Sequence, residues 1–174
     1  SYFLSRSTPD KELLQVASAG KLTADKDEIA RQTERLIKSK TFERFISDFS
    51  DSWLNLREMD FTVPDAQLFP EYDQYLRYSM PKETHAFLNE LVKSNLPIRN
   101  IVKSDFVTVN DRLAKLYGMQ NVVGPEVRRV ETDSDEIRGG LLTQASILKV
   151  SANGTNTSPV VRGIWVMERI LGQT

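Results

Sequence analysis

The residues best suited to bind a ligand lie in two polar segments near the end of the sequence. One is the turn-forming stretch 151–163, SANGTNTSPVVRG, and the other is the stretch 138–146, RGGLLTQAS. Each combines an arginine with glycine and small hydroxyl or amide side chains, which suits a carboxylate, a sulfate or the hydroxyl groups of a sugar. The residues that we expect to form such a site are Arg138, Gly139, Gly140, Gln144, Asn153, Gly154, Thr155, Thr157, Ser158 and Arg162.

The segment 151–163 leads into a predicted helix start. Ser158 is a suitable N-cap and Pro159 occupies the first helical position. The N-terminus of that helix would carry unpaired N–H groups and the positive end of the helix dipole. We expect the helix to be largely buried because of its apolar residues, which are Val160, Val161, Ile164, Trp165, Met167, Ile170 and Leu171.

A self-contained loop is the alternative to a binding site in this region. In that alternative Ser158 only caps the helix, and the asparagine and threonine side chains bond within their own loop. Arg162 would then pair with Glu83 or with another carboxylate. An open pocket beside the loop favours the binding site, whereas an Arg162 buried against a carboxylate favours the alternative.

Glu83 is the carboxylate that we single out elsewhere in the chain. It lies in an otherwise apolar helical stretch, and a buried glutamate needs a partner. Two roles stay open for it, a structural ion pair with Arg138 or Arg162, and a catalytic acid. His85 is the only histidine, and without cysteine or a second histidine it makes a poor metal site, so we interpret it as an ordinary helix residue.

Other catalytic and cofactor motifs are incomplete. Ser146 and Ser151 do not stand in a Gly-x-Ser-x-Gly elbow, and Arg138 with its two glycines is not a phosphate-binding loop. The acidic run 133–136, DSDE, lacks the spacing of a calcium loop, so we interpret it as a solvated loop. We therefore expect no metal and no cofactor within this segment.

Composition removes several classes of function. The 174 residues include 23 Lys and Arg against 24 Asp and Glu, a net charge of −1, which argues against nucleic-acid binding. The absence of cysteine excludes disulfides, thiolate zinc sites, a cysteine nucleophile and covalently attached c-type haem within this sequence. The sequence contains no apolar run of the roughly 20 residues that a transmembrane helix needs.

The pattern of apolar residues predicts a mainly α fold, with about six helices in a bundle-like domain. The clearest helix, about residues 41–56, carries Phe42, Phe45, Ile46, Phe49, Trp53 and Leu54 at helical spacing, which we interpret as core packing. A long helical pattern from Glu71 contains Pro81, where we expect a kink or break. We expect a minor extended element in the C-terminal half, at residues 127–130 and 147–150, and a short strand or extended loop at 105–109.

Several motifs resemble known domains. They are SWLNLR at 52–57, LFPEYD at 68–73, NDRLA at 110–114, RGGLLTQA at 138–145 and TSPVVRG at 157–163. Together they resemble the adjacent bacterial domains of unknown function 1592 and 1588. The resemblance implies that residues 1–80 are the C-terminal part of the first domain, that residues 81–174 form the second, and that the two are packed as one unit. We also expect this sequence to be a piece of a longer chain.

The resemblance also implies a cellular setting without implying an activity. Similar proteins are large, exported to the periplasm or cell surface, and often carry c-type cytochrome or carbohydrate-related modules elsewhere in the chain. We therefore expect a non-catalytic structural or ligand-binding module, whose partners are neighbouring domains of the same polypeptide and an anion or glycan ligand. One alternative is an enzyme domain that acts on an extracellular glycan-type substrate through Glu83, Arg138, Asn153 and Arg162. Another is a surface that docks an electron-transfer partner.

Overall fold

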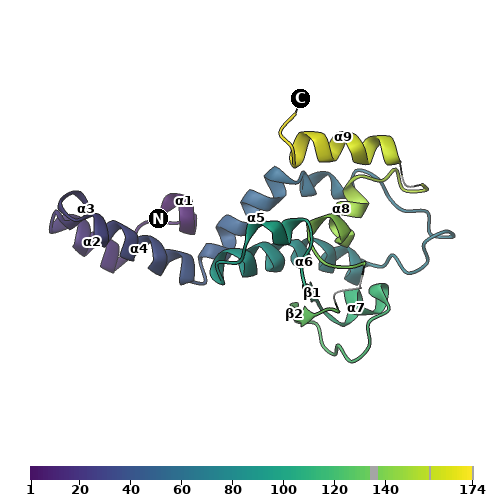
Figure 1. The fold of residues 1–174 in the computed structure, drawn as a ribbon, viewed down its shortest axis with the longest axis horizontal. Helices are drawn as coiled ribbons and strands as arrows, with labels where there is room; N and C mark the ends of the chain where they lie inside the picture. The colour runs from purple at the N-terminus through teal and green to yellow at the C-terminus, as the bar shows by residue number, and fades with distance from the viewer. Residues whose placement is uncertain (134–136, 157, 174) are drawn as a thin grey trace. The chain divides into compact units, whose positions relative to one another are not determined.

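The chain folds mainly into helices (Figure 1). The computed structural model describes residues 1–133, 137–156 and 158–173. Within these residues nine α-helices and a two-stranded antiparallel sheet are present, and 57% of the chain is helical, which confirms the predicted fold class. The chain divides into two compact units, residues 1–49 and residues 50–174.

The first unit is built from short, charged helices. They are α1 (Tyr2–Ser5), α2 (Lys11–Ser18), α3 (Lys21–Ala24), α4 (Lys26–Lys38) and the beginning of α5 (Phe42–Trp53). Asp10 caps α2 through the N–H of Leu13 and also binds Arg35 of α4 at 2.6 Å. Such exposed ion pairs contribute little to stability, so the unit depends on the few side chains that it buries.

The predicted aromatic stripe of α5 is only partly buried. Phe42 and Ile46 are buried, and Phe45 stacks between Phe42 and Phe49. Phe49 is nevertheless 45% exposed, so the prediction that the whole stripe is core is wrong. In the second unit, Trp53 is half-buried and donates its indole N–H to the carbonyl of Arg169 at 2.5 Å.

The long helix α6 (Gln74–Lys93) is the centre of the second unit. Asp73 caps it by accepting the N–H of Leu76, and its buried face packs against α7 (Asp111–Tyr117), α8 (Ala145–Val150) and β1 (Phe106–Val109). The helix continues through Pro81, so the predicted break does not occur. Proline removes a single helix hydrogen bond, and the buried residues on both sides of it hold the helix together.

A small sheet covers part of this core. Strand β1 pairs antiparallel with β2 (Arg128–Glu131), with Phe106 opposite Glu131 and Val109 opposite Arg128. All four residues of β1 are buried, whereas β2 is mostly exposed. The extended elements predicted near 105–109 and 127–130 are therefore confirmed. Helix α7 follows β1 directly, because Asn110 accepts the N–H of Leu113 and caps it.

Two expectations about the C-terminal residues are wrong. Residues 147–150, predicted to be extended, lie in helix α8, which buries Ile147 and Lys149. Helix α9 (Pro159–Arg169) buries only Trp165, while Val160 and Ile164 are 71% and 51% exposed. Trp165 donates its indole N–H to the carbonyl of Leu54 at 3.1 Å, and this bond and the Trp53 bond to Arg169 both attach α9 to the residues around α5. The remaining turns are 3₁₀ helices at Leu56–Asp60, Ile98–Ile101 and Leu141–Thr143.

Candidate functional site

A cavity of about 330 Å³ lies in the second unit. Its volume falls in the range of small-molecule sites, about 300–1,000 Å³. The two polar segments singled out in the sequence both reach it. Segment 138–146 contributes Arg138, and segment 151–163 contributes Gly154, Thr155, Asn156 and Arg162. The structure thus brings these two segments to one cavity.

Helices α6, α7 and α8 supply the apolar wall of the cavity. Leu76 and Met80, one helical turn apart on α6, face it together with Leu116 of α7 and Ala145 and Leu148 of α8. The connector before α6 adds a further set of residues, namely Pro64, Phe69, Glu71 and Tyr72. Glu71 is the only carboxylate among the described residues that line the cavity.

Arg162 lines the cavity from the second turn of α9. Its Nε donates to the hydroxyl of Ser151 at 3.2 Å and its Nη2 to the carbonyl of Leu148 at 3.5 Å, which are both long bonds. In the described part of the chain it forms no salt bridge, and the predicted pair with Glu83 is not present. Since a guanidinium has five N–H donors, most of its donors have no protein acceptor in the described residues.

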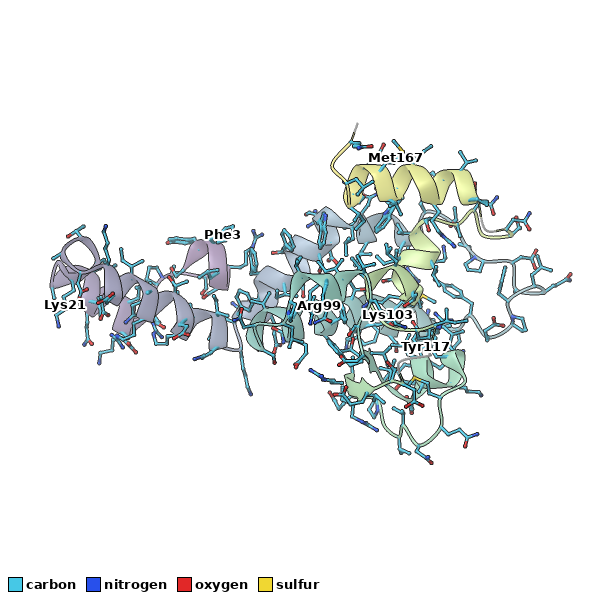
Figure 2. All side chains as sticks on the ribbon, viewed as in Figure 1. Phe3, Lys21, Arg99, Lys103, Tyr117 and Met167 are labelled. Atoms are coloured by element: carbon cyan, nitrogen blue, oxygen red, sulfur yellow. The ribbon has the colours of Figure 1, made fainter. Side chains whose placement is uncertain are left out.

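Arg138 lines the same cavity and is held by an aromatic ring. Its guanidinium stacks 4.1 Å from the ring centre of Tyr117 and donates to the carbonyl of Thr143 at 2.7 Å. Stacking fixes the plane of the guanidinium without consuming its N–H donors. Figure 2 labels Tyr117 at the C-terminal end of α7, where the sequence analysis named no site residue.

The two glycines after Arg138 have a structural role. Gly139 and Gly140 adopt positive φ values of 131° and 85°. A Cβ atom on Gly139 would lie 2.2 Å from the carbonyl oxygen of Ser104, and one on Gly140 would lie 2.6 Å from that of Val102. Both are buried, and neither lines the 330 Å³ cavity, so they allow close backbone packing behind Arg138.

Lys149 is a third cation at the cavity, and the sequence analysis did not identify it. Its Nζ donates to the carbonyls of Met59 and Thr62 at 3.0 and 2.6 Å, and to the Thr62 hydroxyl at 2.8 Å. These bonds use all three ammonium donors. Burial lowers the pKa of Lys149, and the nearby charge of Asp60 opposes that effect. Lys149 therefore joins α8 to the segment around residue 60 and has no donor left for a ligand.

Glu83 does not line the cavity and is buried next to Tyr117. It is 1% exposed, and its two carboxyl oxygens lie 2.8 and 2.7 Å from the Tyr117 hydroxyl. One of these oxygens also accepts the N–H of Ala145 at 3.2 Å. Its predicted arginine partner is therefore replaced by a tyrosine hydroxyl.

The geometry around Glu83 favours a neutral carboxylic acid. A hydroxyl carries one hydrogen, so its two short contacts are both good bonds only when the acid supplies a second proton. Burial raises the pKa of Glu83 to about 8, although the bonds from Tyr117 and Ala145 and the charge of Arg138 favour the ionised form. Burial and the adjacent Glu83 also raise the pKa of Tyr117 well above its ordinary value.

Gln144 belongs to the same buried polar cluster. Its side-chain oxygen accepts the hydroxyl of Thr84 at 2.6 Å, and that hydroxyl also lies 2.6 Å from the Ser146 hydroxyl. All three side chains are buried and absent from the lining of the 330 Å³ cavity. Gln144 thus connects α6 to α8, which places it in the packing that supports the cavity.

In the described residues of the loop before α9, Asn153 and Ser158 accept hydrogen bonds from nearby backbone. Asn153 accepts the N–H groups of Thr155 and Asn156 at 3.2 and 2.7 Å, and Ser158 caps α9 by accepting the N–H of Val161 at 3.3 Å. Gly154 has a φ of 90°, and a Cβ there would lie 2.7 Å from the carbonyl oxygen of Val63. Thr157 and residues 134–136 lie outside the described residues.

The remaining predicted features lie away from the cavity. His85 binds Asp51 through a 2.8 Å contact and does not line it. A search of residues 1–133, 137–156 and 158–173 finds no group of three or more metal-binding side chains. In those residues no helix has the length and apolar character to cross a membrane.

Comparison with known proteins identifies families without known function. The family model of DUF1592, described as a protein of unknown function, matches residues 1–119, and that of DUF1588, described in the same words, matches residues 138–174. The first match extends past residue 80, and the two compact units meet between residues 49 and 50, so the boundary expected at residue 80 stays a prediction. Neither the curated proteins nor the solved structures contain a match. The chain therefore belongs to the DUF1592 family and carries a DUF1588 match in its last part.

Proposed function

We propose that this chain is a non-catalytic, small-molecule-binding module of a larger exported multidomain protein. The cavity of about 330 Å³ carries this proposal, because it combines an apolar wall with the guanidinium groups of Arg138 and Arg162. Apolar clefts with a few convergent polar groups are typical ligand sites. The exported setting, with cytochrome or carbohydrate-related modules as neighbours, rests on the resemblance of the sequence motifs.

The contrast between Arg162 and Lys149 supports a binding role. Lys149 has all its donors satisfied by the protein, as expected of a cation that stabilises a fold. Arg162 has two long bonds and no carboxylate partner among the described residues. A guanidinium left in this condition beside a cavity is available to a ligand that brings its own acceptors.

The enzymatic alternative receives less support from the geometry. Glu83, its proposed acid, is buried behind Tyr117 and does not line the cavity. Asn153, another of its proposed residues, binds the backbone of its own loop. The four residues of that hypothesis therefore do not face one common space.

A ligand screen with a cavity-filling variant tests the proposed function. The whole chain is screened by ligand-observed NMR against a library of small molecules that differ in charge and polarity. Ala152 lines the cavity, so Ala152→Phe is expected to fill it and to abolish the binding of every hit. The control is Ala30→Phe on an exposed position of α4, which should bind like the wild type. A library without hits, or hits that survive Ala152→Phe in a folded protein, would contradict the proposal.

A further inference from the structure

We infer that the ligand of this cavity is a small carboxylate with an apolar body, and that Arg162 binds its carboxylate. This inference rests on the proposed function and specifies it. It depends on three features, which are the guanidinium N–H donors that no described residue accepts, the composition of the wall and the distribution of negative charge.

The guanidinium groups determine the charged end of the ligand. Arg162 and Arg138 both line the cavity, and each keeps N–H donors that no described residue accepts. The planar fork of a guanidinium matches the two oxygens of a carboxylate. Lys149 adds positive charge nearby through its ammonium group, and its donors stay engaged with the protein.

The wall determines the other end of the ligand. Leu76, Met80, Leu116 and Leu148 offer hydrocarbon surface without hydrogen-bonding groups. A sugar bound there would turn hydroxyl groups toward these side chains and leave them unpaired. An inorganic anion would leave the same surface without contacts. A ring or chain of hydrocarbon fills this part of the cavity without either penalty.

The two glutamates nearest the cavity, Glu71 and Glu83, should repel a bound anion only weakly. Glu71, the single carboxylate among the described lining residues, is exposed, so water screens its charge. Glu83, which lies behind Tyr117, has both carboxyl oxygens within hydrogen-bond distance of the tyrosine hydroxyl, and burial raises its pKa and so favours its neutral form. The buried side of the cavity therefore keeps the positive potential of Arg138 and Arg162.

Calorimetry with matched probes tests the inference on the whole chain. The probes are 3-phenylpropanoate, its neutral amide 3-phenylpropanamide, acetate and glucose. We expect 3-phenylpropanoate to bind about tenfold or more tightly than its amide, since a charge-assisted hydrogen bond distinguishes them. Acetate and glucose should bind too weakly to measure. Equal affinities for the acid and the amide, or stronger binding of glucose, would overturn the inference.

Two variants locate the carboxylate. Arg162→Met keeps the length of the side chain and removes its charge, so it should lower the affinity for 3-phenylpropanoate about tenfold and leave the affinity for the amide unchanged. The control, Arg128→Met, removes an exposed arginine of β2 that does not line the cavity, and should change neither affinity. A loss of acid binding in Arg128→Met, or none in Arg162→Met, would contradict the assignment.

The outcomes separate this inference from the proposed function. If neutral library compounds bind and lose their binding in Ala152→Phe, while 3-phenylpropanoate has no advantage over its amide, the cavity is a binding site and the inference fails. If no compound binds in the cavity, both fail.

Discussion

Tyr117 separates two polar environments that differ in how completely the protein satisfies them. Behind it, Glu83 has both oxygens within hydrogen-bond distance of the tyrosine hydroxyl, and Gln144 binds Thr84. On the cavity side of Tyr117, Arg138 and Arg162 line the cavity, and each has N–H donors that no described residue accepts. The difference shows that a charged residue in a polar motif can be assigned to a binding site or to the fold only when its hydrogen-bond partners are known.

Mutations in the two environments should also affect different quantities, namely the stability of the fold on the Glu83 side and ligand affinity on the arginine side. A buried acid without charge is stable only while it keeps its proton and its partners, so the Glu83 side is sensitive to pH and to the loss of Tyr117. A guanidinium beside an open cavity keeps part of its hydration, so its removal affects ligands more than stability.

The largest expected effect is a loss of stability at high pH that depends on Glu83. The pKa of Glu83 is raised from 4.5 to about 8, so its contribution is complete below pH 4.5 and is lost as the pH rises to 8. The unfolded state releases the proton first, which lowers the free energy of unfolding by about 1.4 kcal/mol per pH unit, on the order of 5 kcal/mol in all. Urea denaturation of wild type and Glu83→Gln from pH 4 to 9 measures it. Parallel curves for the two proteins would show that Glu83 does not titrate in this range.

Removal of the Tyr117 hydroxyl should be the next largest effect. Tyr117→Phe leaves the acid proton of Glu83 and the N–H of Ala145 with fewer partners, and should cost about 1–3 kcal/mol of stability at pH 6. The matched control is Tyr78→Phe, where the residue is 63% exposed and the change should stay within about 0.5 kcal/mol. A Tyr117→Phe protein as stable as the control would mean that the cluster behind Tyr117 does not stabilise the fold.

Lys149→Met should have a moderate effect on stability. It leaves the carbonyls of Met59 and Thr62 without their donor, which should cost about 1–2 kcal/mol in chemical denaturation. Loss of a buried ammonium offsets part of this cost, since its desolvation penalty also disappears. A more stable variant would show that the burial of Lys149 outweighs its three bonds.

Arg162→Met should have the smallest effect on stability. Its two protein bonds are long, so the free energy of unfolding should fall by less than about 1 kcal/mol, while the affinity for 3-phenylpropanoate falls. Thermal denaturation with and without the probe measures both quantities. A loss of more than about 3 kcal/mol without ligand would assign Arg162 to the structure and not to the site.

The sequence predicted the features that depend on local pattern. The N-cap Ser158, the helical class and the extended element at residues 127–130 follow from short stretches of sequence. The convergence of Arg138 and Arg162 at a cavity also agrees with the two polar segments from which the sequence analysis began.

The features that depend on tertiary packing could not be predicted. Lys149 can be buried because its ammonium group binds the carbonyls of Met59 and Thr62, which lie about 90 residues earlier in the sequence. Tyr117 meets Glu83 only because α7 packs against α6. The burial of α9 was overestimated because apolar composition does not say which face has a neighbour.

The most direct test of a ligand site at Arg162 is a crystal structure of the whole chain with 3-phenylpropanoate. We predict that its carboxylate lies within hydrogen-bond distance of the Arg162 guanidinium, with the phenyl ring against Leu76 and Leu148. A structure with the cavity empty at saturating probe, or with the carboxylate turned away from both Arg162 and Arg138, would contradict this account.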